Sequence, residues 1–479
     1  MSGRGAGPAG AATVTGRGAF EQRVAAALAD RHVIQAVHLA TRQKVEARAA
    51  ALAALHDPEA IRTLAAQIKQ HTLEHLPDYL EQFAAAVERN GGRVHFAPDA
   101  AAALRIVCDI ARGCGAKLAV KSKSMTTEEI HLNQALEAAG VRVVETDLGE
   151  FIVQLDRDRP SHIVTPIIHK NRTQISATMV RELGCEYTED PTQLTRIARR
   201  YLRDIFRRCD LGVSGVNFGV AETGTLCICT NEGNGRMTVT RPRVHVAVMG
   251  IEKIIPRLRD LPVFLKLLAR SATGQPLTVY TTLLHGPRRP DDPDGPQELH
   301  VVLLDNGRSE TLCGELAEVL RCIRCGACLN ACPVYRNIGG HAYGGVYGGP
   351  IGSVLMPLMA RLHAHGELPR ASSLCGACYA ACPVKIDIPS LLVKLRAATV
   401  RQEPFVKRVG MRLWKWLMLS SPRYRAAQTL LRWLVRGDPS GWVRNGFGPL
   451  RAWTRVRDLP PPPPRSFRRI WTEELRDER

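Results

Sequence analysis

Seven of the 14 cysteines lie between residues 322 and 382, in two runs of regular spacing. The runs read Cys322-x2-Cys325-x2-Cys328-x3-Cys332-Pro333 and Cys375-x2-Cys378-x3-Cys382-Pro383. The first run has the spacing that wraps a backbone around a cubane iron–sulfur cluster, with a proline that turns the chain after the last ligand. Zinc is a weaker alternative. Disulfides are weaker still, because the sequence shows no route to an oxidising compartment.

The pairing of the two runs predicts which thiolates share a cluster. In two-cluster modules, three cysteines of a run hold one cluster and the fourth, beside the proline, belongs to the other. The first cluster is then expected to have four thiolates, from Cys322, Cys325, Cys328 and Cys382. The second is expected to have three, from Cys332, Cys375 and Cys378. We expect both clusters to be of the 4Fe–4S type.

The second run lacks one cysteine. When the runs are aligned on their Cys-Pro ends, Ser372 stands where Cys322 stands in the first run. The second cluster is therefore either a three-iron cluster or a four-iron cluster completed by another ligand. The candidates for that ligand are Ser372, Cys313, a histidine and a residue of a partner protein.

The length of 479 residues and the 45% hydrophobic content predict several folded domains rather than one. We expect four segments: an N-terminus with a helical arm, an open and mostly parallel α/β domain, a helical two-cluster iron–sulfur domain, and a basic helical C-terminal segment. Their expected boundaries are 1–74, 75–305, 306–400 and 401–479.

Apolar periodicity predicts the secondary structure of these segments. The arm is expected to form two helices, at 20–55 and 59–89. In the α/β domain, short strands alternate with helices, which favours right-handed crossovers and a mostly parallel sheet. The strands are expected at 93–97, 117–121, 141–146, 210–216, 225–230, 244–249, 277–281 and 298–304, and the further helices at 100–112, 126–139, 353–365 and 409–419.

The sequence also limits the expected location of the protein. The first 19 residues are rich in Gly and Ala and lack the apolar core of a signal peptide. No stretch approaches the roughly 18 uninterrupted apolar residues of a membrane-spanning helix. We expect a cytoplasmic protein, with peripheral contact at the inner face of the membrane as a further option for the C-terminal segment.

The net charge of +19 is concentrated near the C-terminus. Residues 396–479 contain 19 Arg/Lys against 7 Asp/Glu, a net charge of +12. The same segment holds all six tryptophans: Trp414, Trp416, Trp433, Trp442, Trp453 and Trp471. No nucleic-acid-binding signature accompanies them, so nucleic acid is not an expected partner. A partner subunit or an anionic membrane surface is favoured, and packing of the tail over the cluster module is the alternative.

Three motifs of the α/β domain are candidates for ligand binding, and none is assigned a catalytic residue. Lys121-Ser-Lys123-Ser-Met125 follows a strand and opens a helix, a position that favours an anion. The Gly-rich segment 215–225, which contains Glu222, and the turn 231–236 could line a pocket at the strand ends. His162, His169 and Lys170 are interpreted as packing or surface groups. No dinucleotide-binding fingerprint is found.

The chain resembles the lactate utilisation protein B family of bacterial iron–sulfur proteins. The resemblance rests on Lys121-Ser-Lys-Ser-Met125, Ser161-His-Ile-Val-Thr-Pro-Ile-Ile-His-Lys170, Gly219-Val-Ala-Glu-Thr-Gly-Thr225 and the two cysteine runs with their Gly-rich spacer. It implies an α/β domain similar to the CoA-transferase and ribose-5-phosphate-isomerase group, a two-cluster ferredoxin-like module and a distinct C-terminal segment. Glu222 is the candidate counterpart of the glutamate that CoA-transferases use covalently.

The resemblance implies an electron carrier in a three-protein system that oxidises L-lactate to pyruvate. Its partners would be the other lactate-utilisation subunits, and its acceptor could be a quinone. The alternative is a 2-hydroxy-acid-binding oxidoreductase that acts through its own α/β domain. The absence of a flavin or nicotinamide motif favours the electron carrier, because a cluster alone does not easily accept a hydride. Whether the chain is itself an enzyme stays open at this point.

Overall fold

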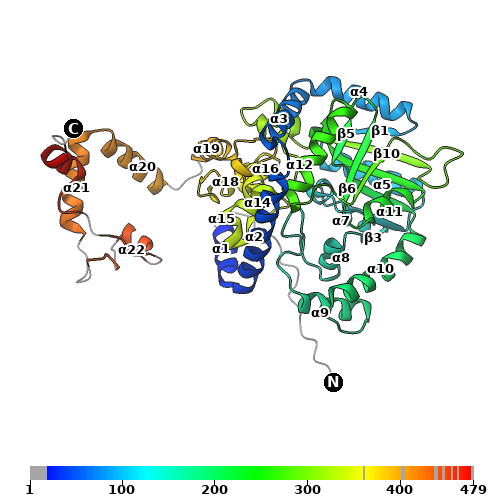
Figure 1. Ribbon diagram of the computed structural model, residues 1–479, viewed down its shortest axis with the longest axis horizontal. Coiled ribbons are helices and arrows are strands. Elements are labelled where there is room, and N and C mark those ends of the chain that lie inside the picture. Colours follow the sequence, from blue (N-terminus) through cyan, green and yellow to red (C-terminus); the bar gives the residue numbers. More distant parts are fainter. Residues whose placement is uncertain are drawn as a thin grey trace. The chain divides into compact units, whose positions relative to one another are not determined.

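The computed structural model describes residues 19–359, 362–400, 405–435, 441–444, 448–454, 457–460 and 463–475 (Figure 1). They belong to two compact units, residues 1–398 and 399–479, which are described separately. The first 18 residues lie outside the described part of the chain, and the proline run 460–464 lies partly outside it.

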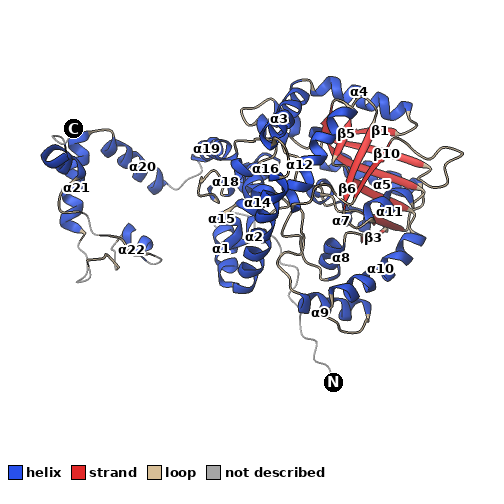
Figure 2. Cartoon of the chain, viewed as in Figure 1, coloured by secondary structure: helices blue, strands red, loops and turns tan. Residues whose placement is uncertain are grey.

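The first unit is built around a six-stranded sheet in which every neighbouring pair is parallel (Figure 2). In sheet order the strands are β1 (Arg93–Ala97), β10 (Glu298–Leu304), β7 (Val244–Gly250), β4 (Leu211–Gly215), β2 (Leu118–Lys121) and β3 (Arg142–Glu145). All seven residues of β7 are buried, as expected for a strand covered on both faces. The open, parallel α/β sheet predicted from the sequence is confirmed.

Alternate residues of the strands pack into different cores on the two faces of this sheet. On one face, Val246 and Val248 of β7 pack with α5 (Ala100–Gly113) and α7 (Leu132–Ala138). On the other, Ala247 and Met249 join the core that continues into the cysteine-rich region. At the β2–β3 end this second face is covered by α8 (Leu148–Leu155), α9 (Arg172–Leu183) and α10 (Pro191–Arg208).

A second, four-stranded sheet was not predicted from the sequence. Its order is β8 (Ile254–Ile255), β5 (Phe218–Val220), β6 (Thr225–Thr230) and β9 (Tyr280–Leu284), with antiparallel β5–β6 and β6–β9 pairs. The expected strand 277–281 was placed three residues too early at each end, since β9 spans 280–284. Strands as short as β5 and β8 carry too few residues for an apolar alternation to be recognised.

Each of the two predicted arm helices is divided in two. The structure contains α1 (Ala19–Ala29) and α2 (Arg31–Ala53), then α3 (Pro58–Glu74) and α4 (Leu76–Arg89). Asp30 caps α2 by accepting a hydrogen bond from Val33 N (3.0 Å), and Pro77 has no N–H with which to continue α3. Helix α2 packs against α12 (Leu261–Thr273) and against the cysteine-rich region, so the arm is part of the folded core.

The cysteine-rich region consists of short helices joined by turns. They are α13 (Arg308–Leu312), α14 (Ala327–Ala331), α15 (Pro333–Ile338), α16 (Gly349–Met359), α17 (Leu362–His365), α18 (Ala377–Ala381) and α19 (Ile388–Thr399). Their buried side chains share one apolar core with α12 and the second sheet. Gly340 shows how tightly this region meets the α/β domain, because a Cβ there would come within 1.7 Å of Ser161 O.

The C-terminal unit contains α20 (Phe405–Met418), which packs against α21 (Ser421–Leu434), followed by the shorter α22 (Pro449–Thr454) and α23 (Phe467–Ile470). The helix predicted at 409–419 corresponds to α20. Among the described residues, no helix combines the length and the apolar character needed to cross a bilayer.

Candidate metal centre

The two cysteine runs adopt the same local structure. Arg324 and Leu374, which occupy equivalent positions, both have positive φ angles of 59° and 55°. Gly326 and Gly376 follow with φ angles of 76° and 81°, a conformation that glycine adopts without strain. Each run then forms a five-residue helix, α14 or α18, and these two helices pack against each other. This packing brings the two runs together as a pair.

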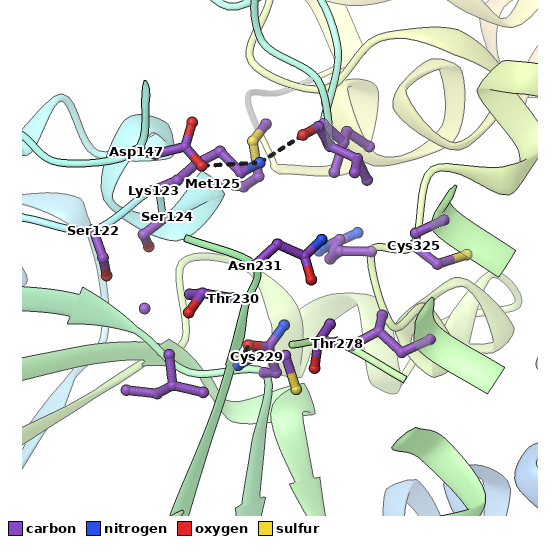
Figure 3. Close-up of a pocket in the computed structure, with 18 of the residues that line it drawn as sticks. Ser122, Lys123, Ser124, Met125, Asp147, Cys229, Thr230, Asn231, Thr278 and Cys325 are labelled. Carbon is purple, nitrogen blue, oxygen red and sulfur yellow. Dashed lines mark hydrogen bonds and ion pairs between the residues drawn. The ribbon is translucent and has the colours of Figure 1, made fainter. Parts of the chain in front are cut away.

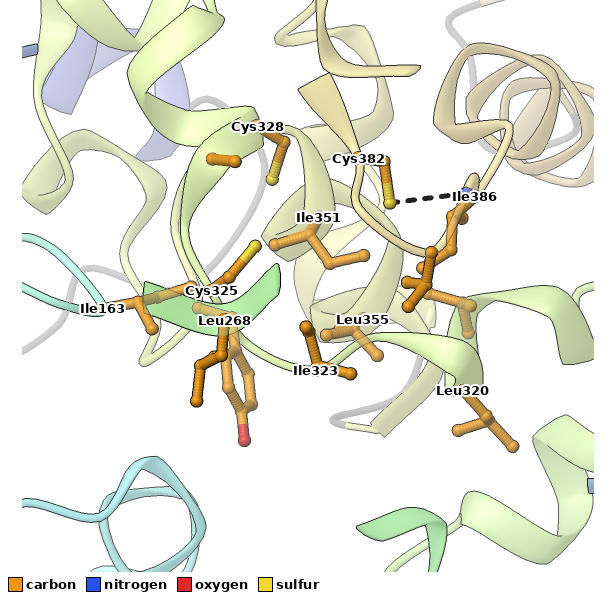
Figure 4. Close-up of a cluster of buried hydrophobic side chains, with 14 of the residues drawn as sticks. Ile163, Leu268, Leu320, Ile323, Cys325, Cys328, Ile351, Leu355, Cys382 and Ile386 are labelled. Atoms are coloured by element: carbon orange, nitrogen blue, oxygen red, sulfur yellow. Dashed lines mark hydrogen bonds between the residues drawn. The ribbon is translucent and has the colours of Figure 1, made fainter. Parts of the chain in front are cut away.

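The thiols lie in two adjoining groups, as their mutual effects on pKa values indicate. Burial raises the pKa of Cys325 to about 12, and nearby Cys382 and Cys322 contribute to the increase. Burial also raises the pKa of Cys328, with contributions from Cys322, Cys325 and Cys382 and a smaller one from Cys378. Figure 4 shows the sulfurs of Cys325, Cys328 and Cys382 facing a common space beside Ile351. These residues, with Cys322, form the first thiol group.

The second thiol group contains Cys332, Cys375 and Cys378. Burial raises the pKa of Cys378 to about 11, with contributions from Cys332 and Cys375. Burial also raises the pKa of Cys332, and Cys375 makes a smaller contribution in the same direction. Cys375 is exposed, and its neighbour Leu374 is 37% exposed. The second group therefore reaches the protein surface, whereas Cys325, Cys328 and Cys382 of the first group are buried.

Backbone N–H groups point at sulfur atoms in both groups. Tyr335 N donates to Cys332 Sγ (3.4 Å), Ile386 N to Cys382 Sγ (3.3 Å) and Arg324 N to Cys322 Sγ (3.4 Å). Such donors stabilise thiolate charge. Converging thiols, N–H donors and an apolar surround are what a cubane cluster requires, so the residues present fit iron–sulfur clusters.

The N-terminal arm supports the end of the second run. Arg62 donates from Nη2 to Cys382 O (2.8 Å) and Ala380 O (2.9 Å), and Arg48 donates from Nη2 to Ala381 O (3.0 Å). These bonds satisfy carbonyl groups at the end of α18 that the short helix leaves without intrahelical partners. The arm thereby fixes the backbone that carries Cys382.

A buried ionic network joins the α/β domain to the first run. Glu252, which follows β7, binds Arg308 Nε through Oε2 (2.6 Å) and Arg324 Nη2 through Oε1 (3.2 Å). Arg308 also binds Glu129 (2.9 Å), which accepts a hydrogen bond from Tyr347 Oη (2.9 Å). Burial alone would raise the pKa of Glu252, but the two arginines hold it at about 2. The carboxylate is therefore ionised at neutral pH.

A cavity of about 280 Å³ lies between the parallel sheet and the first run (Figure 3). Its walls include the residues that follow β2, β3, β4 and β7 at their carboxyl ends, the usual ligand position in an open α/β sheet. Ser122, Lys123 and Ser124 follow β2, Asp147 follows β3, Val216 and Asn217 follow β4, and Lys253 follows β7. Arg324 and Cys325 close the cavity from the cysteine-rich side. We refer to it as the strand-end cavity.

The predicted anion motif 121–125 contributes to this cavity only in part. Ser122 to Met125 line it, and Lys123 Nζ donates to Val164 O (2.8 Å) and lies 3.9 Å from Asp147 Oδ2. Lys121 instead forms buried ion pairs with Glu145 (2.7 Å) and Glu128 (2.9 Å). The helix that the motif opens, α6 (Met125–Glu129), is a single short turn.

Glu222 lies outside the strand-end cavity. It is exposed in the turn between β5 and β6, where its Oε2 accepts a hydrogen bond from Leu258 N (2.9 Å). It therefore supports a turn and does not occupy a position comparable to a nucleophile in a pocket. Asn231 and Glu232 of the predicted turn do line the cavity, and Glu232 Oε2 accepts a hydrogen bond from Leu148 N (2.9 Å).

The segment 161–170 holds the α/β domain and the cysteine-rich region together. His162 Nδ1 accepts hydrogen bonds from Val164 N (3.0 Å) and Thr165 N (3.1 Å), which leaves Nε2 to donate to Asn330 Oδ1 (3.1 Å). Burial lowers the pKa of His162 to about 3, so the ring is neutral. His169 lies between Ser161 Oγ and Asp158 Oδ2, at 2.8 Å from each, and Lys170 binds Asp156 and Asp158. These roles agree with the packing interpretation.

Three of the cysteines outside the two runs are Cys313, Cys227 and Cys229. Cys313 is exposed directly after α13. Cys227 and Cys229 of β6 have their sulfurs 3.9 Å apart, and Cys229 lines the strand-end cavity. Lys253, Arg324 and Asp147, which line the cavity, were not predicted as site residues from the sequence. The rule that ligands bind at carboxyl ends of parallel strands could have pointed to Asp147 and Lys253, which follow the ends of β3 and β7.

Comparisons with known proteins agree with this architecture. Three family models match the chain: the LUD domain over residues 80–304, the 4Fe-4S dicluster domain over 318–386, and the C-terminal domain of lactate utilisation protein B over 397–476. Lactate utilization protein B from Bacillus cereus (strain AH820) is 45% identical over 453 residues, which cover 94% of this chain and 96% of that protein. The protein of the same name from Bacillus thuringiensis (strain Al Hakam) matches with the same identity and coverage.

Among solved structures, a DUF162 family protein from Deinococcus radiodurans is 14% identical and has a TM-score of 0.26, over 48% of this chain and 98% of that one. The fold and the paired cysteine runs define an iron–sulfur protein in which a LUD domain is joined to a 4Fe-4S dicluster domain. With nearly full-length relatives at 45% identity, the chain belongs to the lactate utilisation protein B family.

Proposed function

We propose that this chain is the iron–sulfur electron-transfer subunit of a cytoplasmic system that oxidises L-lactate to pyruvate. The observation that carries the proposal is the arrangement of seven thiols in two adjoining groups. Clusters held by such thiolates accept and return single electrons, and two neighbouring clusters make a short relay. The substrate is suggested by the relatives from Bacillus, which are called lactate utilization protein B.

The proposed ligand sets follow the two thiol groups. Cys322, Cys325, Cys328 and Cys382 would hold the first cluster, and Cys332, Cys375 and Cys378 the second. In each set, the last cysteine of one run belongs with cysteines of the other. The packing of α14 against α18 and the mutual pKa effects within each group support this exchange.

We assign the fourth ligand position of the second cluster to Ser372. Its Oγ accepts a hydrogen bond from Leu374 N (3.1 Å), in the same way that Cys322 Sγ accepts one from Arg324 N. The hydroxyl is therefore presented by the same local backbone as the thiol it replaces. With this ligand the second cluster would be of the 4Fe–4S type, like the first.

Oxidation of L-lactate to pyruvate releases two electrons and two protons. We place that step on a partner subunit, because thiolate-held clusters exchange one electron at a time and do not easily accept a hydride. This chain would then pass the electrons singly to an acceptor such as a quinone. Contact with a partner is proposed at the second thiol group, where Cys375, Leu374 and Tyr379 are exposed.

Docking is assigned to the C-terminal unit. Helix α20 exposes Met411, Trp414 and Met418, among other large apolar side chains, and no residue of this helix is buried. Lys407, Arg408, Arg412 and Lys415 of the same helix supply positive charge. An apolar surface with a cationic border suits a partner subunit or an anionic membrane surface.

The function is tested with the anaerobically purified chain, assayed for L-lactate-dependent dye reduction alone and after addition of its partner subunits. We expect turnover only with the partners. Robust turnover by the single chain would favour the alternative, a 2-hydroxy-acid oxidoreductase acting through its own α/β domain. Absence of any lactate-dependent reduction in the assembled system would contradict both functions.

A further inference from the structure

The strand-end cavity contains two buried cations with unpaired donor atoms. Lys253 is 7% exposed, and its Nζ makes no hydrogen bond or ion pair with the described residues. Arg324 binds Glu252 through Nη2 and lies over the ring of Tyr347, 4.6 Å from its centroid, and its Nη1 is buried without a hydrogen-bond partner among the described residues. A buried ammonium without a counter-charge and a buried N–H without an acceptor are both costly, so Lys253 Nζ and Arg324 Nη1 are each expected to gain a partner.

Both cations lie on the wall that separates the cavity from the first thiol group. Cys325 also lines the cavity, and Figure 3 shows its sulfur pointing away from Asn231 and Asp147. In Figure 4 the same sulfur faces the space shared with Cys328 and Cys382. Cys325 therefore lies between the cavity and the thiol group.

The remaining walls suit a small molecule, and they combine polar groups with apolar side chains such as Ile163, Ile228 and Leu268. The volume of about 280 Å³ is below that of most cofactor pockets. Hydroxyl groups come from Ser122, Thr165, Thr230 and Thr278. Asp147 and Glu232 add two carboxyl groups. Burial, and to a smaller extent the charge of the nearby Asp147, raises the pKa of Glu232 to about 7.

We propose that the strand-end cavity binds a small organic carboxylate, whose two oxygens pair with Lys253 Nζ and Arg324 Nη1. Two free cationic donors match the two oxygens of a carboxylate. Phosphate has more charged oxygens than this wall has free donors, and Asp147 and Glu232 disfavour a dianion in the same space. The hydroxyl groups on the other walls suit a substituent such as the oxygen of a 2-hydroxy or 2-oxo acid, and the apolar side chains suit its short carbon chain.

The proposal goes beyond electron transfer, because it assigns a ligand to the LUD domain. A competing role for the two cations is to balance negative charge on the first cluster, since both lie near Cys322. The two roles differ in one measurable respect: the ligand-binding role requires saturable carboxylate binding, and the charge-balancing role does not. Binding is measured without turnover, so it can succeed or fail independently of lactate oxidation.

The test uses the full-length, cluster-loaded chain under anaerobic conditions. L-lactate, pyruvate and inorganic phosphate are titrated separately by calorimetry, and the electron paramagnetic resonance spectrum of the reduced protein is recorded with and without pyruvate. We expect at least one of the two carboxylates to bind saturably at one site per chain and more tightly than phosphate. We also expect it to perturb the signal of the cluster at Cys325.

Variants locate the site. Lys253→Gln should weaken carboxylate binding at least about tenfold, the effect of losing one charged hydrogen bond. Lys117→Gln, an exposed lysine before the amino end of β2, should bind as the parent chain does. If Lys253→Gln does not retain its clusters, Lys123→Gln on another wall of the same cavity provides the test and should also weaken binding.

Three results would overturn the proposal. The first is no saturable binding of L-lactate or pyruvate to the parent chain, which would leave charge balance as the role of Lys253. The second is tighter binding of phosphate than of either carboxylate. The third is equal binding by the Lys253 or Lys123 variant and the Lys117 variant, which would place the ligand outside the cavity.

Discussion

Ser372 occupies in the second cysteine run the hydrogen-bonding position that Cys322 occupies in the first. Leu374 N donates to the Ser372 hydroxyl and Arg324 N donates to the Cys322 thiol, at 3.1 Å and 3.4 Å. Leu374 and Arg324 share the same positive φ conformation. The two runs are therefore repeats of one loop, and at this position the second has a hydroxyl where the first has a thiol.

Ser372→Ala should convert the second cluster to a three-iron form, because the fourth iron loses its oxygen ligand. The iron content should fall by about one per chain, and a three-iron signal should be seen by electron paramagnetic resonance of the oxidised protein. Cys313→Ala is the matched control, since Cys313 is the other nearby ligand considered, and it should leave both measurements unchanged. An unchanged spectrum for Ser372→Ala, or a three-iron signal for Cys313→Ala, would contradict the assignment.

In the proposed ligand sets, the last cysteine of each run holds the cluster of the other run. Variants of cysteines that hold the same cluster should therefore damage the same cluster, whichever run they belong to. Cys382→Ser should damage the same cluster as Cys322→Ser, although the two residues belong to different runs. Cys332→Ser should damage the other cluster, together with Cys378→Ser. Spectra of the reduced variants check this. If Cys382→Ser matched Cys378→Ser instead, each run would hold its own cluster and the exchanged ligand sets would be wrong.

Glu252 should matter for stability because it is the buried anion between Arg308 and Arg324. Glu252→Gln leaves both arginines without that charge, and breaking a buried ion pair costs on the order of 3 kcal/mol. Thermal unfolding followed by circular dichroism should show a clearly lower midpoint. The control is Glu298→Gln, which removes a partly exposed carboxylate that pairs with Arg93, Arg243 and His300; exposed pairs of this kind are each worth at most about 1 kcal/mol. Equal midpoints for the two variants would contradict a structural role for the network.

Removal of residues 405–479 should leave both clusters in place, because the first compact unit ends at residue 398. The truncated chain should keep its iron content and visible absorbance but fail to co-purify with its partner subunits or with membranes. Loss of the clusters, or precipitation of the truncated chain, would mean that the C-terminal unit belongs to the core of the cluster module. Retained complex formation would assign docking to another surface.

Local patterns in the sequence were sufficient to predict the parts of the structure that depend on local spacing. The cysteine runs and the parallel sheet are of this kind, since the strands are near-continuous apolar runs bounded by turns. Features that depend on tertiary contacts were missed. Lys121 was a candidate anion ligand, but Glu145 on the neighbouring strand pairs with it. The short strands β5 and β8 also left no clear periodic signal, whereas the division of the arm at His75 follows from Pro77, a local signal that was overlooked.

In the strand-end cavity, too, the residues that local sequence patterns identify were predicted, and a residue that depends on tertiary contacts was not. Ser122 to Met125, Asn231 and Glu232 were recognised as possible pocket residues because they lie in turns after strands. Lys253 was not recognised, because a single lysine after β7 becomes a candidate ligand group only when Arg324, 71 positions later in the chain, lines the same cavity. That approach depends on the packing of the dicluster domain against the LUD domain.

The central claim is that this chain carries electrons from L-lactate without oxidising it alone. The most direct measurement mixes oxidised chain with L-lactate under anaerobic conditions and follows cluster reduction by electron paramagnetic resonance, with and without the partner subunits. The account predicts that both clusters become reduced only when the partners are present, and that pyruvate forms in proportion. Reduction of the clusters by L-lactate in the isolated chain, or pyruvate formation by the complete system with clusters that stay oxidised, would contradict it.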